Sequence, residues 1–196
     1  GVNEDSNATG DLDITQNVTI QGNGAGKTLI DGKGIDRVFQ LASGLTVTLK
    51  DLTIQGGDAT SEAFPYGGGI FNQSNLTLNQ VRINGNKATV GGGVVNATGG
   101  TLTIVGSTLD NNQSVKAGDG SEGDGGGVGV YTGTVALVNS TLSGNTAAGS
   151  GGGLVFLDGT LALNNITIFG NTADVGGGVS VGTTDNVSIV HSIIAG

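Results

Sequence analysis

The residues best suited to bind a metal ion lie in one glycine-rich stretch, KAGDGSEGD at residues 116–124. Asp119, Glu122 and Asp124 lie within six residues of one another, and the glycines between them let the backbone curl. Carboxylate oxygens at such spacing are ligands that Ca²⁺ accepts. The stretch matches neither the EF-hand loop nor the calcium-binding nonapeptide repeat. Two interpretations stay open, a calcium site at these three residues or a plain solvated loop, and no other cofactor is expected.

Chemistry on polysaccharides would need a different set of residues. Glycosidases use two carboxyl groups that flank the scissile bond, and lyases need a base set beside acids that hold calcium. The chain has two arginines, Arg37 and Arg82, one histidine, His191, and no cysteine. The arginines stand as lone charges, and a histidine without a partner acid is a poor activator of a nucleophile. We therefore predict no catalytic residue and no enzyme activity.

These residues are carried by an internal repeat, whose clearest marks are a glycine triplet and an asparagine. The triplets begin 24, 34, 26 and 25 residues apart, at Gly67, Gly91, Gly125, Gly151 and Gly176. The asparagines recur at Asn23, Asn86, Asn112, Asn145 and Asn171, and Gly57 fills the same position in one unit. Amides stacked at a regular spacing hydrogen-bond to one another and satisfy the backbone of a turn. We therefore interpret these asparagines as a structural ladder.

The residues before each ladder position alternate with the period of a β-strand. The third residue before it is always aliphatic, and the fourth is Thr in every unit except one, where Arg82 stands. Aliphatic residues also occupy the eighth and tenth positions before it in most units. This pattern indicates two short strands in each unit, joined by a corner and buried on one face.

A unit of about 25 residues with no helical periodicity can bury its aliphatic columns only by stacking on copies of itself. The sequence therefore predicts an all-β parallel β-helix of about seven coils, with no capping helix. At about 4.8 Å per coil, this stack is roughly 35 Å tall.

The repeat motif also resembles that of a known group of proteins. G-G-G-[IVL], followed by an aliphatic strand pair and G-N, is similar to the right-handed parallel β-helix repeats of the pectin-lyase-like superfamily. It resembles still more the repeats of secreted bacterial adhesins and polymorphic outer-membrane proteins, which pair G-G-A-[ILV] with F-x-x-N. Phe169, Gly170 and Asn171 are similar to the second of these motifs. The resemblance implies a right-handed β-helix, in a superfamily that contains lyases, hydrolases, adhesins and structural fibres.

The whole chain, residues 1–196, is predicted to be one domain with surface insertions near residues 58–66 and 113–124. The first insertion carries the only proline between Phe64 and Tyr66. Proline cannot donate to a strand ladder, so this segment is a loop. Its two aromatic side chains either pack on the neighbouring coil or form a platform on which sugar rings stack.

Composition limits the partners and the location of the protein. The net charge is −9, and only seven Lys and Arg residues are scattered along the chain, so nucleic acid and anionic lipid would be repelled. No apolar run is long enough for membrane insertion. The chain begins at Gly1 and contains no Met and no Cys, which suits a mature secreted product or a piece of a longer chain. We expect an extracellular or cell-surface protein.

The two ends of the predicted stack suggest its function. Ile193 and Ile194 precede Gly196 in a last strand that nothing covers, and the segment that starts with Gly1 and Val2 contains no cap. Uncovered strand edges pair with other strands. We predict an extracellular structural protein that joins head to tail with its own copies into a filament. The alternatives are a segment of an adhesin passenger domain that binds surfaces or glycans, and a polysaccharide lyase or hydrolase.

Overall fold

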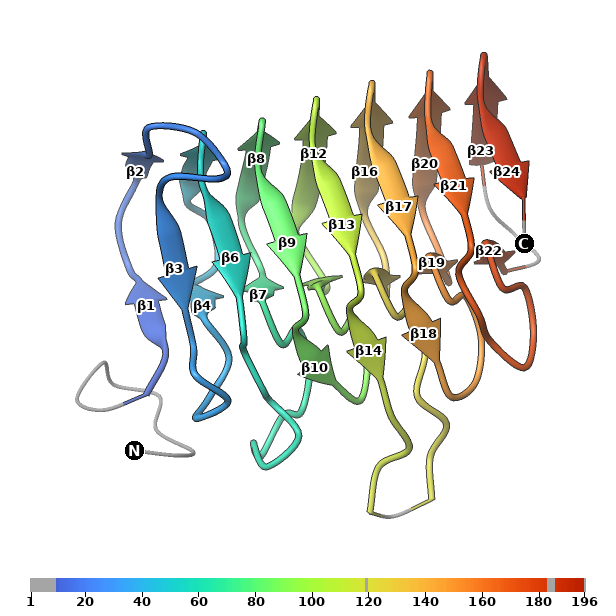
Figure 1. Ribbon diagram of the computed structural model, residues 1–196, viewed down its shortest axis with the longest axis horizontal. Coiled ribbons are helices and arrows are strands. Elements are labelled where there is room, and N and C mark those ends of the chain that lie inside the picture. The colour runs from blue at the N-terminus through green and yellow to red at the C-terminus, as the bar shows by residue number, and fades with distance from the viewer. Residues whose placement is uncertain (1–9, 119, 183–185, 196) are drawn as a thin grey trace.

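The computed structural model describes residues 10–118, 120–182 and 186–195, and Gly1, Val2, Asp119 and Gly196 lie outside these described residues. The described chain is all-β, with 24 strands and no helix. It winds into a parallel β-solenoid of seven coils, with the first coil at one end of the stack and the last coil at the other (Figure 1). The prediction of a parallel β-helix of about seven coils is confirmed.

Each coil contributes one strand to each of three parallel sheets, which we name A, B and C. Sheet A stacks β1 (Leu12–Ile14), β4 (Phe39–Leu41), β7 (Ile70–Asn72), β11 (Val94–Asn96), β15 (Val128–Val130), β19 (Leu154–Phe156) and β22 (Val179–Val181). Sheet B stacks β2 (Val18–Gln21), β5 (Thr46–Lys50), β8 (Asn75–Asn79), β12 (Thr101–Val105), β16 (Thr134–Val138), β20 (Thr160–Asn164) and β23 (Asn186–Val190). Sheet C stacks β3 (Leu29–Asp31), β6 (Thr53–Gln55), β9 (Arg82–Asn84), β13 (Thr108–Asp110), β17 (Thr141–Ser143), β21 (Thr167–Phe169) and β24 (Ile193–Ala195). A short sheet D joins β10 (Lys87–Ala88), β14 (Gln113–Ser114) and β18 (Thr146–Ala147).

Sheet A is a set of strands that the sequence pattern missed. We predicted two strands in each coil, and these are the strands of sheets B and C; the third strand follows the glycine triplet. The strands of sheet A are only three residues long, and their outward residues include the buried Val95 and Val155. With apolar residues on both faces, such short strands show no alternation.

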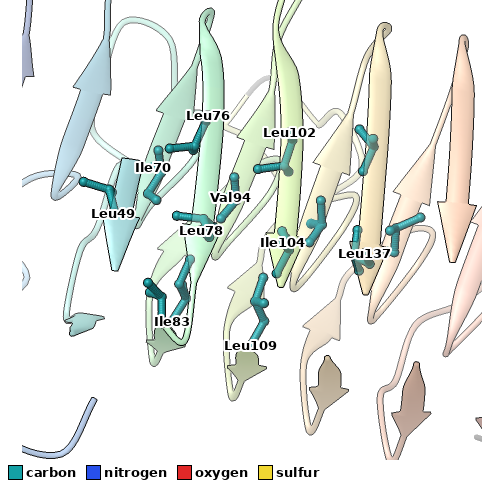
Figure 2. Packing of buried hydrophobic residues seen from close by; sticks show 14 of the residues in the cluster. Leu49, Ile70, Leu76, Leu78, Ile83, Val94, Leu102, Ile104, Leu109 and Leu137 are labelled. Carbon is teal, nitrogen blue, oxygen red and sulfur yellow. The ribbon is translucent and has the colours of Figure 1, made fainter. Parts of the chain in front are cut away.

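The core is one continuous cluster of apolar side chains, aliphatic apart from Phe39 and Phe156, which lie inside the three sheets (Figure 2). In sheet B, for example, equivalent residues of successive coils pair in register and are at most 1% exposed. They are Leu49, Leu78, Ile104, Leu137 and Leu163. Each of these side chains therefore depends on the coils above and below for its burial.

The glycine triplets form the corner at which neighbouring coils come closest. Gly91 has a φ of +61°, which an L side chain rarely adopts, so this position turns the chain. A Cβ atom on Gly92 would lie 2.4 Å from the carbonyl oxygen of Gln113, and one on Gly93 would lie 2.6 Å from that of Gly127. Both carbonyls belong to the next coil, so the second and third glycines are needed for close approach.

The asparagine ladder is confirmed at Asn86, Asn112, Asn145 and Asn171, which are at most 3% exposed. Each of the last three accepts, at its Oδ1, the side-chain and backbone amides of the ladder residue before it, at 2.9 to 3.1 Å. Each Nδ2 also donates to a carbonyl of the preceding coil, at 2.9 to 3.2 Å. The ladder thus supplies partners for the polar groups of a buried corner.

The first coil departs from the predicted ladder. Asn23 is exposed and follows β2 of sheet B, so it lies at a different corner from the other ladder residues. The ladder residues instead follow sheet C by two positions, and Lys33 has that place in the first coil. Gly57 does occupy the ladder, since its N–H donates to Asn86 Oδ1 at 2.9 Å. The prediction for Asn23 was wrong because the segment before it pairs with β5, not with β6.

The substitution Leu163→Asp tests the buried columns. Leu163 is 1% exposed, so a carboxylate there would be buried without a partner. We expect a loss of roughly 4 kcal/mol or more in the free energy of unfolding, measured by denaturant titration. Leu157→Asp, at a side chain that is 44% exposed, is the control and should change stability far less. Equal effects of the two substitutions would show that the register of the columns is incorrect.

The substitution Asn145→Ala tests the ladder. It removes the partners of the Asn112 backbone amide and of the Leu109 carbonyl, both buried at the corner. We expect a cost of roughly 2–5 kcal/mol in the same assay. Asn164→Ala, at an exposed position of β20, should stay within about 0.5 kcal/mol of the parent. A small effect at Asn145 would argue against a stabilising ladder.

Candidate functional site

Two surface insertions leave the stack on the same side, next to sheet D (Figure 1). The first spans residues 58–66, and its ends bridge to Lys87 and Val90 of the next coil. The second begins after Ser114, because Gln113 and Ser114 form β14. Val90 also bridges to Asp124, so the ends of the two insertions lie two coils apart, with Val90 on the coil between them.

A buried arginine anchors the first insertion to the body of the β-helix. The Arg37 side chain is 2% exposed; its Nε lies 3.0 Å from Asp11 Oδ2, and its Nη2 lies 3.4 Å from Glu62 Oε2. Its Nη1 donates to the carbonyl oxygen of Tyr66 at 2.9 Å. Arg37 was predicted to be a lone surface charge, and this prediction was wrong. No local pattern marks the cluster, because its members come from three separate segments.

The same cluster perturbs the carboxyl group of Glu62. Burial raises the pKa of Glu62 from its ordinary value of 4.5 to about 7, and the hydrogen bond and negative charge of Asp36 act in the same direction. The positive charge of Arg37 opposes this rise, and Asp11 adds to it. The folded protein therefore keeps Glu62 protonated to a higher pH than the unfolded chain does.

The pH dependence of stability tests this cluster. The folded state binds the Glu62 proton more tightly than the unfolded chain does. The stabilisation that this proton provides is therefore complete below about pH 4.5 and is lost as the pH rises to about 7. In Glu62→Gln, the fall in the free energy of unfolding over this range should be smaller, by on the order of 1–3 kcal/mol. Glu122→Gln, on the exposed second insertion, should keep the slope of the parent. An unchanged slope in Glu62→Gln would contradict the assignment.

A pair of tyrosines divides the surface beside the insertions into two hollows. The rings of Tyr66 and Tyr131 meet edge to face, with centroids 5.5 Å apart and planes at 67°. Burial raises the pKa of Tyr131, and a side-chain hydrogen bond with Tyr66 adds to this. The pair therefore joins residues that lie two coils apart.

One hollow, which we call the aromatic groove, has a volume of about 510 Å³. Its lining residues are Gln40, Phe64, Tyr66, Phe71, Gln73, Ala97, Thr98 and Tyr131. Phe64 is 65% exposed, so it does not pack on the coil below, which was one of the two predictions for it. Gln40 and Phe71 pair in register on the outward side of sheet A and form the floor.

The other hollow, which we call the loop pocket, lies between the two insertions and has a volume of about 590 Å³. Its lining includes the carboxylates Glu62, Glu122 and Asp124. Glu122 forms an ion pair with Lys116 at 3.0 Å, and Asp124 Oδ1 accepts the backbone N–H of Ser150 at 2.6 Å.

Two of the three predicted calcium ligands therefore already have partners within the protein. Glu122 and Asp124 contact other groups, and Asp119 lies outside the described residues. Among the described residues, no three or more His, Cys, Asp or Glu side chains form a group that could hold a metal ion.

The remaining charged candidates have structural surroundings. Arg82 pairs with Asp110 through two contacts, Nε to Oδ1 at 2.9 Å and Nη2 to Oδ2 at 2.6 Å. This pairing raises the pKa of Arg82. His191 has a φ of 49° at the corner between sheets B and C, the place that Gln80 and Asn139 have in other coils. Because the equivalent residues of other coils share this positive φ, we interpret His191 as a turn residue.

The last coil exposes large apolar side chains, some of them in columns that are buried in the inner coils. Of the predicted assembly residues, Ile193 is 64% exposed and Ile194 is 44% exposed, while Gly1, Val2 and Gly196 lie outside the described residues. Val181, Ile189 and Val190 are also 40–45% exposed. These residues belong to β22, β23 and β24, the last strand of each sheet.

Comparisons with known proteins add no functional assignment. No protein-family model matches the chain, and no match is found among curated proteins or solved structures. Within the described ranges, no helix has the length and apolar character needed to cross a membrane.

Proposed function

We propose that this β-helix is an extracellular structural element that extends by end-to-end stacking. The exposure of the inward columns at the last coil carries the proposal. Ile189 and Ile194 are 45% and 44% exposed, whereas Leu163 and Ile168, which precede them in the same columns, are 1% and 0% exposed. Apolar surface of this kind, next to unpaired backbone groups, is a template for another strand layer.

The first coil of a second copy fits this template sheet by sheet. Strands β1 and β3 match β22 and β24 in length, at three residues each, and β2 has four residues against the five of β23. The inward columns would continue in aliphatic pairs, namely Val179 with Leu12, Val187 with Val18, Ile189 with Ile20 and Ile194 with Ile30. A second copy would therefore bury what each end exposes.

The outward columns also favour this partner. Across the junction the outward pairs would be Ser180 with Asp13, Ser188 with Thr19, Val190 with Gln21, Ile193 with Leu29 and Ala195 with Asp31. No pair brings like charges together. Such a contact joins two different surfaces, so it propagates into an open filament unless the rotation closes a ring. The axial repeat would be seven coils, or roughly 35 Å.

A second candidate is a segment of an adhesin passenger domain that binds surface glycans. It is supported by the resemblance of the glycine-triplet repeats to secreted adhesins and by the exposed aromatic groove. Neither candidate assigns catalysis to the chain, and Arg82 and His191 have the structural surroundings described above. The low Lys and Arg content and the net charge of −9 support partners other than nucleic acid.

Two lysine substitutions test the stacking in a complementary way. Ile189→Lys places a charge on the inward face of the last coil, and Val18→Lys does the same on the first coil. Each variant alone should be monomeric by analytical ultracentrifugation, whereas the parent should form filaments visible by electron microscopy. Mixed together, the two variants should form dimers, because one intact last coil meets one intact first coil.

Val190→Lys is the matched control. Val190 is 43% exposed, close to Ile189, but its side chain points outward, so filaments should persist. A parent protein that stays monomeric at all concentrations would refute the stacking. Equal loss of assembly in Val190→Lys, or mixed variants that stay monomeric, would refute the proposed register.

A further inference from the structure

The aromatic groove combines flat apolar rings with uncharged polar side chains. Phe64, Tyr66 and Tyr131 form its walls, and Phe71 forms part of its floor. The uncharged polar side chains of the lining include Gln40, Gln73 and Thr98. Amide and hydroxyl groups both donate and accept hydrogen bonds, as the hydroxyl groups of a sugar do. Aromatic rings provide apolar surface for the C–H faces of a sugar ring.

From this lining we propose that the aromatic groove binds a neutral oligosaccharide. The volume of about 510 Å³ lies within the range of ordinary ligand sites, about 300–1,000 Å³. Phe64 presents an aromatic side chain that is 65% exposed at its edge. An exposed phenylalanine that adjoins such a groove provides contact area for a ligand without losing core packing.

Electrostatics selects a neutral ligand over an acidic one. The eight residues that line the aromatic groove carry no formal charge. Beyond the tyrosine pair, the loop pocket presents Glu122 and Asp124, and the chain as a whole carries a net charge of −9. An acidic polysaccharide would meet a repulsive potential here, so uronate polymers are disfavoured.

The groove is also held in place before any ligand arrives. Arg37, 2% exposed, donates to the carbonyl oxygens of Tyr66 and Phe64, at 2.9 and 3.5 Å. Its guanidinium carbon also lies 5.4 Å from the centre of the Phe71 ring. One buried cation thus fixes both a wall and the floor, which lowers the entropic cost of binding a ligand.

Isothermal titration with defined oligosaccharides tests the proposal. The probes are cellohexaose, xylohexaose, mannohexaose, N-acetylchitohexaose and hexagalacturonate, and they are titrated into the Ile189→Lys variant so that stacking plays no part. We expect at least one neutral hexasaccharide to bind, and hexagalacturonate to bind about tenfold more weakly or not at all. Phe64→Ala should weaken the neutral ligand by about tenfold.

Phe169→Ala is the matched control. Phe169 is 50% exposed on β21 of sheet C, does not line the groove, and should leave affinity unchanged. Mass spectrometry should recover the oligosaccharide at its original length. Binding of none of the neutral probes, preference for hexagalacturonate, equal affinity in Phe64→Ala, or preferential binding of a decaproline peptide would each overturn the proposal. Shortened sugar would overturn a purely binding role.

Discussion

The close approach of neighbouring coils at the glycine corner is the constraint on which the stack depends. Any side chain at Gly92 or Gly93 would meet a carbonyl oxygen of the next coil at 2.4 to 2.6 Å. With glycine there, the coils reach strand spacing, and only at that spacing do the sheet hydrogen bonds form and the amides of Asn112 and Asn145 meet. One steric condition therefore makes the backbone pairing, the ladder and the aliphatic core mutually compatible.

Much of the fold could be predicted because the repeat shows these conditions directly in the sequence. Columns such as Leu137 and Leu163, and ladder residues such as Asn145, recur in register in almost every coil. Asn23 failed because a ladder residue is defined by the coil it pairs with, and a short motif can occur at another corner. Asn72 and Asn96 were missed for a different reason, because asparagine does not recur in their column. Both are buried, and Asn72 Nδ2 donates to Asn96 Oδ1 at 2.7 Å, but neighbouring coils place Leu41 and Val130 in that column.

The candidate site was harder to predict than the fold, because it does not repeat. Phe64 and Tyr66 were recognised as a possible platform from their own segment, which contains both aromatics. Tyr131, which completes the groove, gave no signal, since it lies two coils from Tyr66 and meets it only in the folded stack. Arg37 was misjudged because its partners are distant in sequence, and a single arginine reads as a surface charge until folding surrounds it with Asp11 and Glu62.

In each sheet of the β-helix, a strand forms hydrogen bonds only with the strands of the preceding and the following coil. Cooperativity is therefore of the nearest-neighbour kind. Local opening of an inner coil breaks two interfaces, but opening of an outermost coil breaks one, so amide exchange should begin at the ends and progress inward. A further layer of strands on an outermost coil would give it a second interface, so its amides would then exchange as slowly as those of an inner coil.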